Sequence, residues 1–105
     1  MRTIVLGFLA GLMGLNALPH LIRGITAQEY PNLTGNSPVR NAVAAWGGLV
    51  IAGLLAAWSD AGAHPWTAFV AVALGALVMV VFHASGGAYR LNTRFGKENP
   101  VRQDR

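Results

Sequence analysis

Four polar side chains interrupt the long apolar stretches of this sequence and are its candidates for chemistry: Asn16, His20, Asn41 and His83. A histidine imidazole can transfer a proton near neutral pH, and an asparagine amide both donates and accepts hydrogen bonds. Asn16 and His20 are four residues apart, so on a helix they lie one turn apart on the same face. Together the four could move a proton or bind a polar group.

Other kinds of site find little support in the sequence. There is no cysteine, which excludes disulfides, thiolate metal ligands and cysteine nucleophiles. Two histidines without a nearby carboxylate fall short of the three protein ligands that are usual at catalytic zinc. All four acidic residues lie outside the apolar stretches, at Glu29, Asp60, Glu98 and Asp104. We therefore expect no metal, no cofactor and no enzymatic activity.

Charged residues divide the chain into three apolar stretches. Arg2 and Arg23 bound the first stretch, and Arg40 and Asp60 bound the second. The third stretch, residues 61–89, carries no formal charge. Each stretch approaches or exceeds the roughly 20 predominantly apolar residues that a membrane-spanning helix needs. A soluble bundle is the alternative, but it would need polar helix faces that these stretches lack.

The sequence therefore predicts an all-α fold, a three-helix transmembrane bundle formed by one membrane domain over residues 1–105. The spans are expected at about 3–22, 39–59 and 65–88. The first stretch could also be a signal peptide, but Leu15 would have to occupy a small-residue position of the cleavage site. We expect an uncleaved span.

The second span has a clear start. Ser37 can cap the helix, and Pro38 suits the first helical position because its missing N–H has no partner there. His64 and Pro65 start the third span in a similar way, and Gly86 with Gly87 marks its fading end.

Basic residues are distributed unequally between the two sides of such a bundle. One side would carry only Arg2. The other side would carry the remaining seven of the eight basic residues, at positions Arg23, Arg40, Arg90, Arg94, Lys97, Arg102 and Arg105. We expect the protein in the inner membrane of the cell. The positive-inside rule then places the N-terminus outside and the basic tail, residues 90–105, in the cytoplasm. Because the basic residues mark topology, we expect the lipid bilayer and not nucleic acid as the partner.

Small residues form stripes along the predicted helices. Gly7, Gly11 and Gly14 share a face of the first span, while Gly48 and Gly75 belong to comparable stripes in the second and third. Small residues allow helix backbones to approach closely in lipid, where apolar burial does not drive association. This predicts helix packing at these glycines and assembly into a homo-oligomer or a larger membrane complex. The alternative is that the stripes reflect composition alone.

The orientation places all four polar candidates in the cytoplasmic half of the membrane. Polar groups at that depth are costly unless paired, so we predict that Asn16, His20, Asn41 and His83 lie close together. In the alternative interpretation both histidines are wet interfacial residues, and Asn41 only helps to start its helix.

Two sequence motifs carry a family resemblance. Asn16-Ala17-Leu18-Pro19-His20 is followed by Gly24 and then by Ser-Pro-Val-Arg-Asn-Ala-Val-Ala-Ala-Trp-Gly over 37–47. These motifs, within residues 14–50, resemble a family of small bacterial multi-pass integral membrane proteins with Pro-His at the end of span one. Relatives often carry another asparagine in the second span, where this chain has Leu49, Val50 and Ile51. The resemblance implies a membrane protein and carries no activity over to this chain.

Three kinds of function agree with these features. The first is a binding or accessory membrane subunit that assembles through its small-residue helix faces. The second is a transporter or channel protomer acting as an oligomer, although the four-span multidrug exporters of similar length use an embedded glutamate that this chain lacks. The third is a histidine-using membrane enzyme or quinone-binding protein, in which His20 and His83 would transfer protons.

Overall fold

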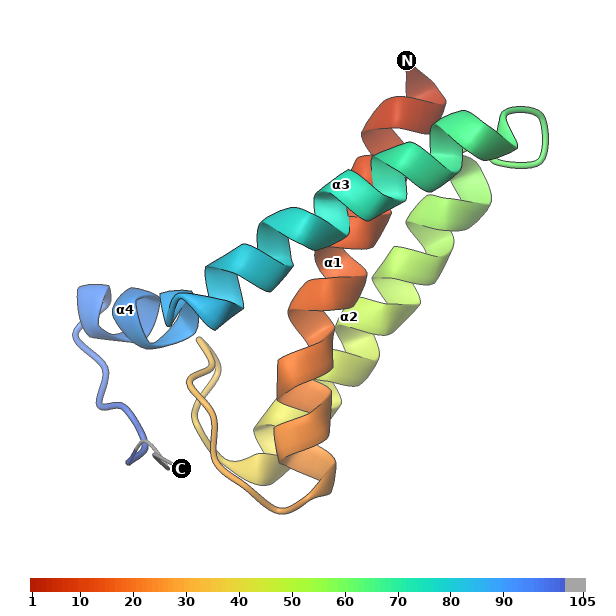
Figure 1. Cartoon of the computed structure of the whole chain (residues 1–105). Helices are drawn as coiled ribbons and strands as arrows, with labels where there is room; N and C mark the ends of the chain where they lie inside the picture. Colours follow the sequence, from red (N-terminus) through yellow and green to blue (C-terminus); the bar gives the residue numbers. More distant parts are fainter. Residues whose placement is uncertain (102–105) are drawn as a thin grey trace.

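The computed structural model describes residues 1–101, which form four helices and no strand (Figure 1). Three are long, α1 (Arg2–Ile25), α2 (Pro38–Trp58) and α3 (Pro65–Ala84), and one is short, α4 (Gly87–Arg94). The long helices are apolar enough and long enough to cross a membrane. At about 1.5 Å per residue they measure roughly 30 to 36 Å, close to the thickness of the hydrocarbon core. The all-α fold with three long apolar helices is thus confirmed.

The start of α2 follows the expected capping chemistry. Ser37 is the N-cap residue, and its hydroxyl oxygen accepts a hydrogen bond from the backbone N–H of Arg40 at 3.3 Å. Pro38 and Pro65 occupy the first turns of α2 and α3. Their rings fix a helical φ where no N–H partner is needed.

The central helix of the bundle is α1, which packs against both α2 and α3. In the described part of the chain, α2 and α3 make no backbone contact with each other. Figure 1 shows α3 crossing α1 at an angle and diverging from the other two helices toward its C-terminal end. The three helices are therefore close together at one end and open at the other.

Glycines set the close contact between α1 and α3. A Cβ atom added at Gly11 would overlap the carbonyl oxygen of Val72, and one added at Gly75 would overlap that of Phe8. At Gly7 the added atom would lie 3.1 Å from the side chain of Ala71. These backbones approach so closely because no side chain separates them.

The other two predicted packing glycines face the contact between α1 and α2. A Cβ added at Gly48 would lie 3.3 Å from that of Ala17, and one at Gly14 would lie 3.8 Å from that of Ala52. The small-residue stripe of α1 is thus occupied by helices of the same chain.

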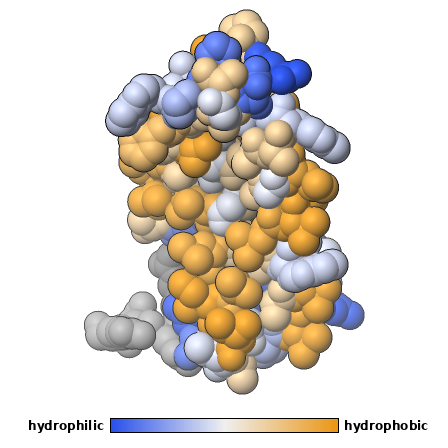
Figure 2. Space-filling model, turned by 90° about the vertical axis from the view of Figure 1, so that its right-hand side faces the viewer, coloured by the Kyte–Doolittle hydropathy of each residue, from blue (hydrophilic) through white to orange (hydrophobic). Residues whose placement is uncertain are grey.

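Large apolar side chains cover much of the outside of the helices. Figure 2 shows hydrophobic residues over the middle of one face and hydrophilic residues mainly toward the ends. Among the most exposed are Trp46, Trp66, Phe69, Val39 and Val43. A soluble monomer rarely exposes so large an apolar surface, but lipid would cover it.

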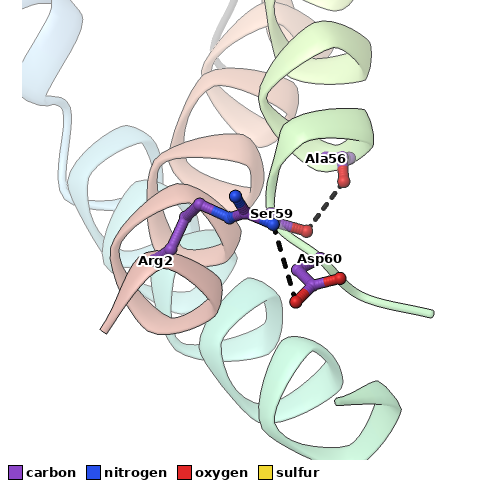
Figure 3. A network of polar contacts seen from close by, with 4 residues as sticks. All are labelled: Arg2, Ala56, Ser59 and Asp60. Atoms are coloured by element: carbon purple, nitrogen blue, oxygen red, sulfur yellow. Dashed lines mark hydrogen bonds and ion pairs between the residues drawn. The ribbon is translucent and has the colours of Figure 1, made fainter. Parts of the chain in front are cut away.

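The turn between α2 and α3 is pinned to the start of α1 (Figure 3). The Ser59 hydroxyl donates to the carbonyl oxygen of Ala56 at 2.7 Å, and the Arg2 guanidinium lies 3.5 Å from the Asp60 carboxylate. Asp60 adopts a positive φ of 62° as the chain turns. The contact between Arg2 and Asp60 is the only ion pair within residues 1–101.

The third span differs from its expected range of 65–88. The helix ends at Ala84, and Gly86 takes a left-handed φ of 80° before α4 begins. Glycine adopts that conformation without the steric penalty of a side chain. The bend makes the first part of the expected tail, residues 90–94, helical, whereas residues 102–105 lie outside the described residues.

Candidate functional site

A loop fills the open end of the bundle and builds the site. Residues 26–37 leave α1, fold back and return to α2, and Tyr30 is buried within this turn with 7% of its surface exposed. The segments before and after the loop lie close together, since a Cβ added at Gly24 would be only 2.7 Å from the carbonyl oxygen of Pro38. The absence of a side chain at Gly24 allows this approach. The loop is thereby directed into the space that α3 leaves open (Figure 1).

Asn41 fastens this loop to the helices. Its side chain is fully buried, and its amide nitrogen lies 2.9 to 3.1 Å from three backbone carbonyl oxygens, which share its two N–H donors. The acceptors belong to Tyr30, Asn36 and Ser37. Since carbonyl oxygens accept only, the orientation of the Asn41 amide is fixed.

The same asparagine sets the tautomer of His20. The Asn41 Oδ1 atom lies 2.6 Å from His20 Nδ1. Because Oδ1 can only accept, the proton of this hydrogen bond belongs to His20 Nδ1. A neutral imidazole then keeps its lone pair on Nε2, which has no hydrogen-bond partner within the described part of the chain.

His83 ties α3 to α1 and to the loop. Its Nε2 lies 3.0 Å from Asn16 Oδ1, and its Nδ1 lies 3.1 Å from the hydroxyl of Tyr30. In the arrangement that satisfies all these atoms, Nε2–H donates to Asn16 and the tyrosine hydroxyl donates to Nδ1. One ring therefore joins three segments of the chain.

Ring contacts join the hydrogen-bonded pair of His20 and Asn41 to the group formed by His83, Asn16 and Tyr30. The His20 ring lies 5.1 Å from the Tyr30 ring and 5.7 Å from the His83 ring, both edge to face. No direct hydrogen bond joins the two histidines in residues 1–101. The structure thus brings Asn16, His20, Asn41 and His83 into one cluster around Tyr30.

A partly enclosed pocket of about 130 Å³ adjoins this cluster. Its polar lining residues are Asn16 and His20 of α1, His83 of α3, Asn92 of α4 and Asn32 of the loop. Its apolar lining includes Phe82, Leu33, Ala88 and Leu91.

Asn92, which lines this pocket, has an unsatisfied acceptor. The residue is 1% exposed, and its amide nitrogen donates to Asn36 Oδ1 at 3.2 Å and to the Glu98 carbonyl oxygen at 3.1 Å. Its own Oδ1 is buried and has no donor among residues 1–101. Such a group costs about 1–3 kcal/mol when left unpaired. The pocket is therefore lined by two residues that each have an acceptor without a partner in residues 1–101, Asn92 with Oδ1 and His20 with Nε2.

A metal ion does not fit this arrangement. No three histidine, aspartate or glutamate side chains converge anywhere in residues 1–101. The two histidines direct their Nδ1 and Nε2 atoms mainly to amides and a hydroxyl. The polar atoms of this cluster can form hydrogen bonds to a small organic group or to water.

Two residues of the site, Tyr30 and Asn92, were not predicted from the sequence. An aromatic residue inside a loop of proline, asparagine and glycine was a usable signal for Tyr30, because such a ring rarely stays in water. Asn92 gave no signal, since its position depends on the bend at Gly86.

No protein-family model, curated protein or solved structure matches this chain. The family resemblance of residues 14–50 therefore stays a prediction.

Proposed function

We propose that this chain is a small multi-pass membrane protein that binds a small molecule in the pocket between α1, α3 and α4. Asn92 carries this proposal, because it lines the pocket and its buried Oδ1 atom has no donor within residues 1–101. Buried polar atoms are nearly always hydrogen-bonded, so an unpaired one at a pocket indicates a missing partner.

The ligand should combine a hydrogen-bond donor with a small apolar body. A hydroxyl or an amine would complement Asn92 Oδ1 and His20 Nε2, whereas Phe82 and Leu33 would contact carbon. A cavity of similar size, about 150 Å³, holds a benzene ring in an engineered protein. A single ring bearing a hydroxyl therefore agrees with both the volume and the polarity.

Phenol and anisole test this chemistry, because they have similar shapes but only phenol donates a hydrogen bond. We expect phenol to shift the imidazole NMR resonances of His20 in the reconstituted protein, and the shift should saturate as the phenol concentration rises. Anisole should bind about tenfold more weakly, the value of roughly one lost hydrogen bond.

Two variants in which leucine replaces alanine test whether phenol binds in this pocket. Ala88→Leu should fill the pocket and abolish the phenol response, because Ala88 lines it. Ala44→Leu on the exposed face of α2 should leave the response unchanged. Equal responses to phenol and anisole, or an unchanged response in Ala88→Leu, would contradict the proposal.

An accessory role through assembly is the second candidate. The glycines of α1 are covered by α2 and α3, so a partner chain would have to use other faces. On α2, Gly47 and Gly53 have open space beside them, with Trp46 and Val50 exposed nearby. That face could receive a second copy or a larger complex as readily as lipid.

The proposed location is a bacterial inner membrane, with the N-terminus outside. Because the chain has no native cysteine, single cysteines can report the topology. Gly62→Cys, in the exposed turn after α2, should react with an impermeant maleimide on intact cells, whereas Glu98→Cys should react only after permeabilisation. The reverse pattern would overturn the orientation.

A further inference from the structure

The open end of the bundle carries basic residues that have no acidic partner in the described part of the chain. The only ion pair within residues 1–101, Arg2 with Asp60, lies at the opposite end. Two acids, Glu29 and Glu98, accompany these basic residues, but within residues 1–101 no carboxylate approaches any of them within ion-pair distance. The basic residues concerned are Arg23, Arg40, Arg90, Arg94 and Lys97. This end is therefore positively charged.

The short helix α4 is amphipathic in a specific way. Its buried face, which includes Ala88 and Asn92, packs toward the loop. Leu91 and Phe95 are one turn apart and are 39% and 61% exposed. The exposed residues Arg90 and Arg94, also one turn apart, lie beside that apolar pair.

The position of α4 matches the edge of a bilayer. It follows α3 after only two residues, and Figure 1 shows it leaving at an angle to that helix. The Lys97 ammonium donates to the Leu33 carbonyl oxygen, and Asn92 donates to Asn36, so α4 and the segment after it are fixed to the loop. A helix in the membrane interface places its apolar residues among acyl chains and its basic residues among headgroups.

Arg90 is oriented for recognition of an anion. Two of its guanidinium nitrogens donate to the carbonyl and hydroxyl oxygens of Ser85, which fixes the plane of the group. Arginine has five N–H donors, so others remain available for phosphate oxygens. An open groove of about 600 Å³ lies beside it, with the side chains of Thr93 and Asn99 in its lining.

We propose that α4 binds the phosphate headgroups of anionic phospholipids through Arg90 and Arg94, with Leu91 and Phe95 inserted into the acyl region. The positive charge selects anionic over zwitterionic lipid, and the adjacent apolar pair selects a lipid over free phosphate. The binding does not depend on a ligand in the pocket.

Lipid retention provides the test. The full chain is reconstituted into nanodiscs of phosphatidylcholine mixed with phosphatidylglycerol, and the lipids that remain bound are counted by native mass spectrometry. We expect enrichment of phosphatidylglycerol. Arg94→Gln should reduce this enrichment by about fivefold, and Arg90→Gln/Arg94→Gln should reduce it further.

Three controls make the result specific. Arg94 has no side-chain hydrogen bond within residues 1–101, so its replacement does not disturb the fold described here. Arg90→Lys/Arg94→Lys should keep most of the enrichment, and Arg2→Gln at the other end should keep all of it. Equal retention of the two lipids, or unchanged enrichment in the double glutamine variant, would overturn the proposal. Displacement of the lipid by inorganic phosphate beyond that caused by chloride of equal ionic strength would overturn its assignment to a lipid.

Discussion

Gly11→Leu should destabilise the bundle by about 3 kcal/mol or more. A Cβ atom at this position would already overlap the carbonyl oxygen of Val72, so a leucine forces α1 and α3 apart. Separation of these helices also moves Gly75 away from Phe8 and removes the close packing on which the contact depends. Unfolding in a mixed detergent series, followed by circular dichroism, measures the loss.

Gly53→Leu is the matched control for that substitution. Gly53 lies within α2 on its exposed side, with nothing within 4 Å of an added Cβ. The same change of residue type there should not lower the unfolding free energy, because leucine is favoured over glycine in a helix by up to about 1 kcal/mol. Similar losses in both variants would show that helix propensity or detergent effects, and not the α1–α3 contact, control the stability.

Asn41→Leu should cost about 3–5 kcal/mol, because it removes four hydrogen bonds of a buried network at once. The carbonyl oxygens of Tyr30, Asn36 and Ser37 lose a donor, and His20 Nδ1 loses its acceptor. The loop over residues 26–37 should loosen, so trypsin in mild detergent should cleave after Arg23 or Arg40 faster than in the parent protein.

Asn99→Leu tests whether that effect is specific to the buried network. Asn99 is exposed and donates only to Tyr89 and Thr93, outside the loop. This variant should retain the parent stability to within about 0.5 kcal/mol and the parent rate of cleavage. An Asn41→Leu protein with the parent stability and an equally protected loop would contradict the role given to Asn41.

The long helices, and the end of the bundle at which the polar residues lie, could be predicted from the sequence. Spans depend on length and composition, which the charge-free stretches between Arg2, Arg23, Arg40 and Asp60 display directly. Asn16, His20 and His83 each lie within about seven residues of a basic residue at the same end, which determines depth at about 1.5 Å per residue. The cap at Ser37 followed from residue types alone.

Rotation and backbone turns could not be predicted in this way. Depth does not determine which glycine of α1 faces α2 and which faces α3, because that depends on the crossing of the helices. The inward position of Asn92 depends on the left-handed φ of Gly86, and the burial of Tyr30 depends on the space that α3 leaves open. Both residues complete the pocket from outside the predicted spans.

The tautomer of His20 tests the pocket most directly. If Asn41 holds Nδ1–H, nitrogen-15 spectra of the protein in bilayers should show a protonated Nδ1 and an unprotonated Nε2 for a neutral His20 ring. Saturating phenol should then shift Nε2 more than Nδ1, because Nε2 carries the available lone pair. A neutral His20 ring protonated on Nε2 would contradict the network, since it could not donate to Asn41 or accept a hydrogen bond from a ligand at that atom.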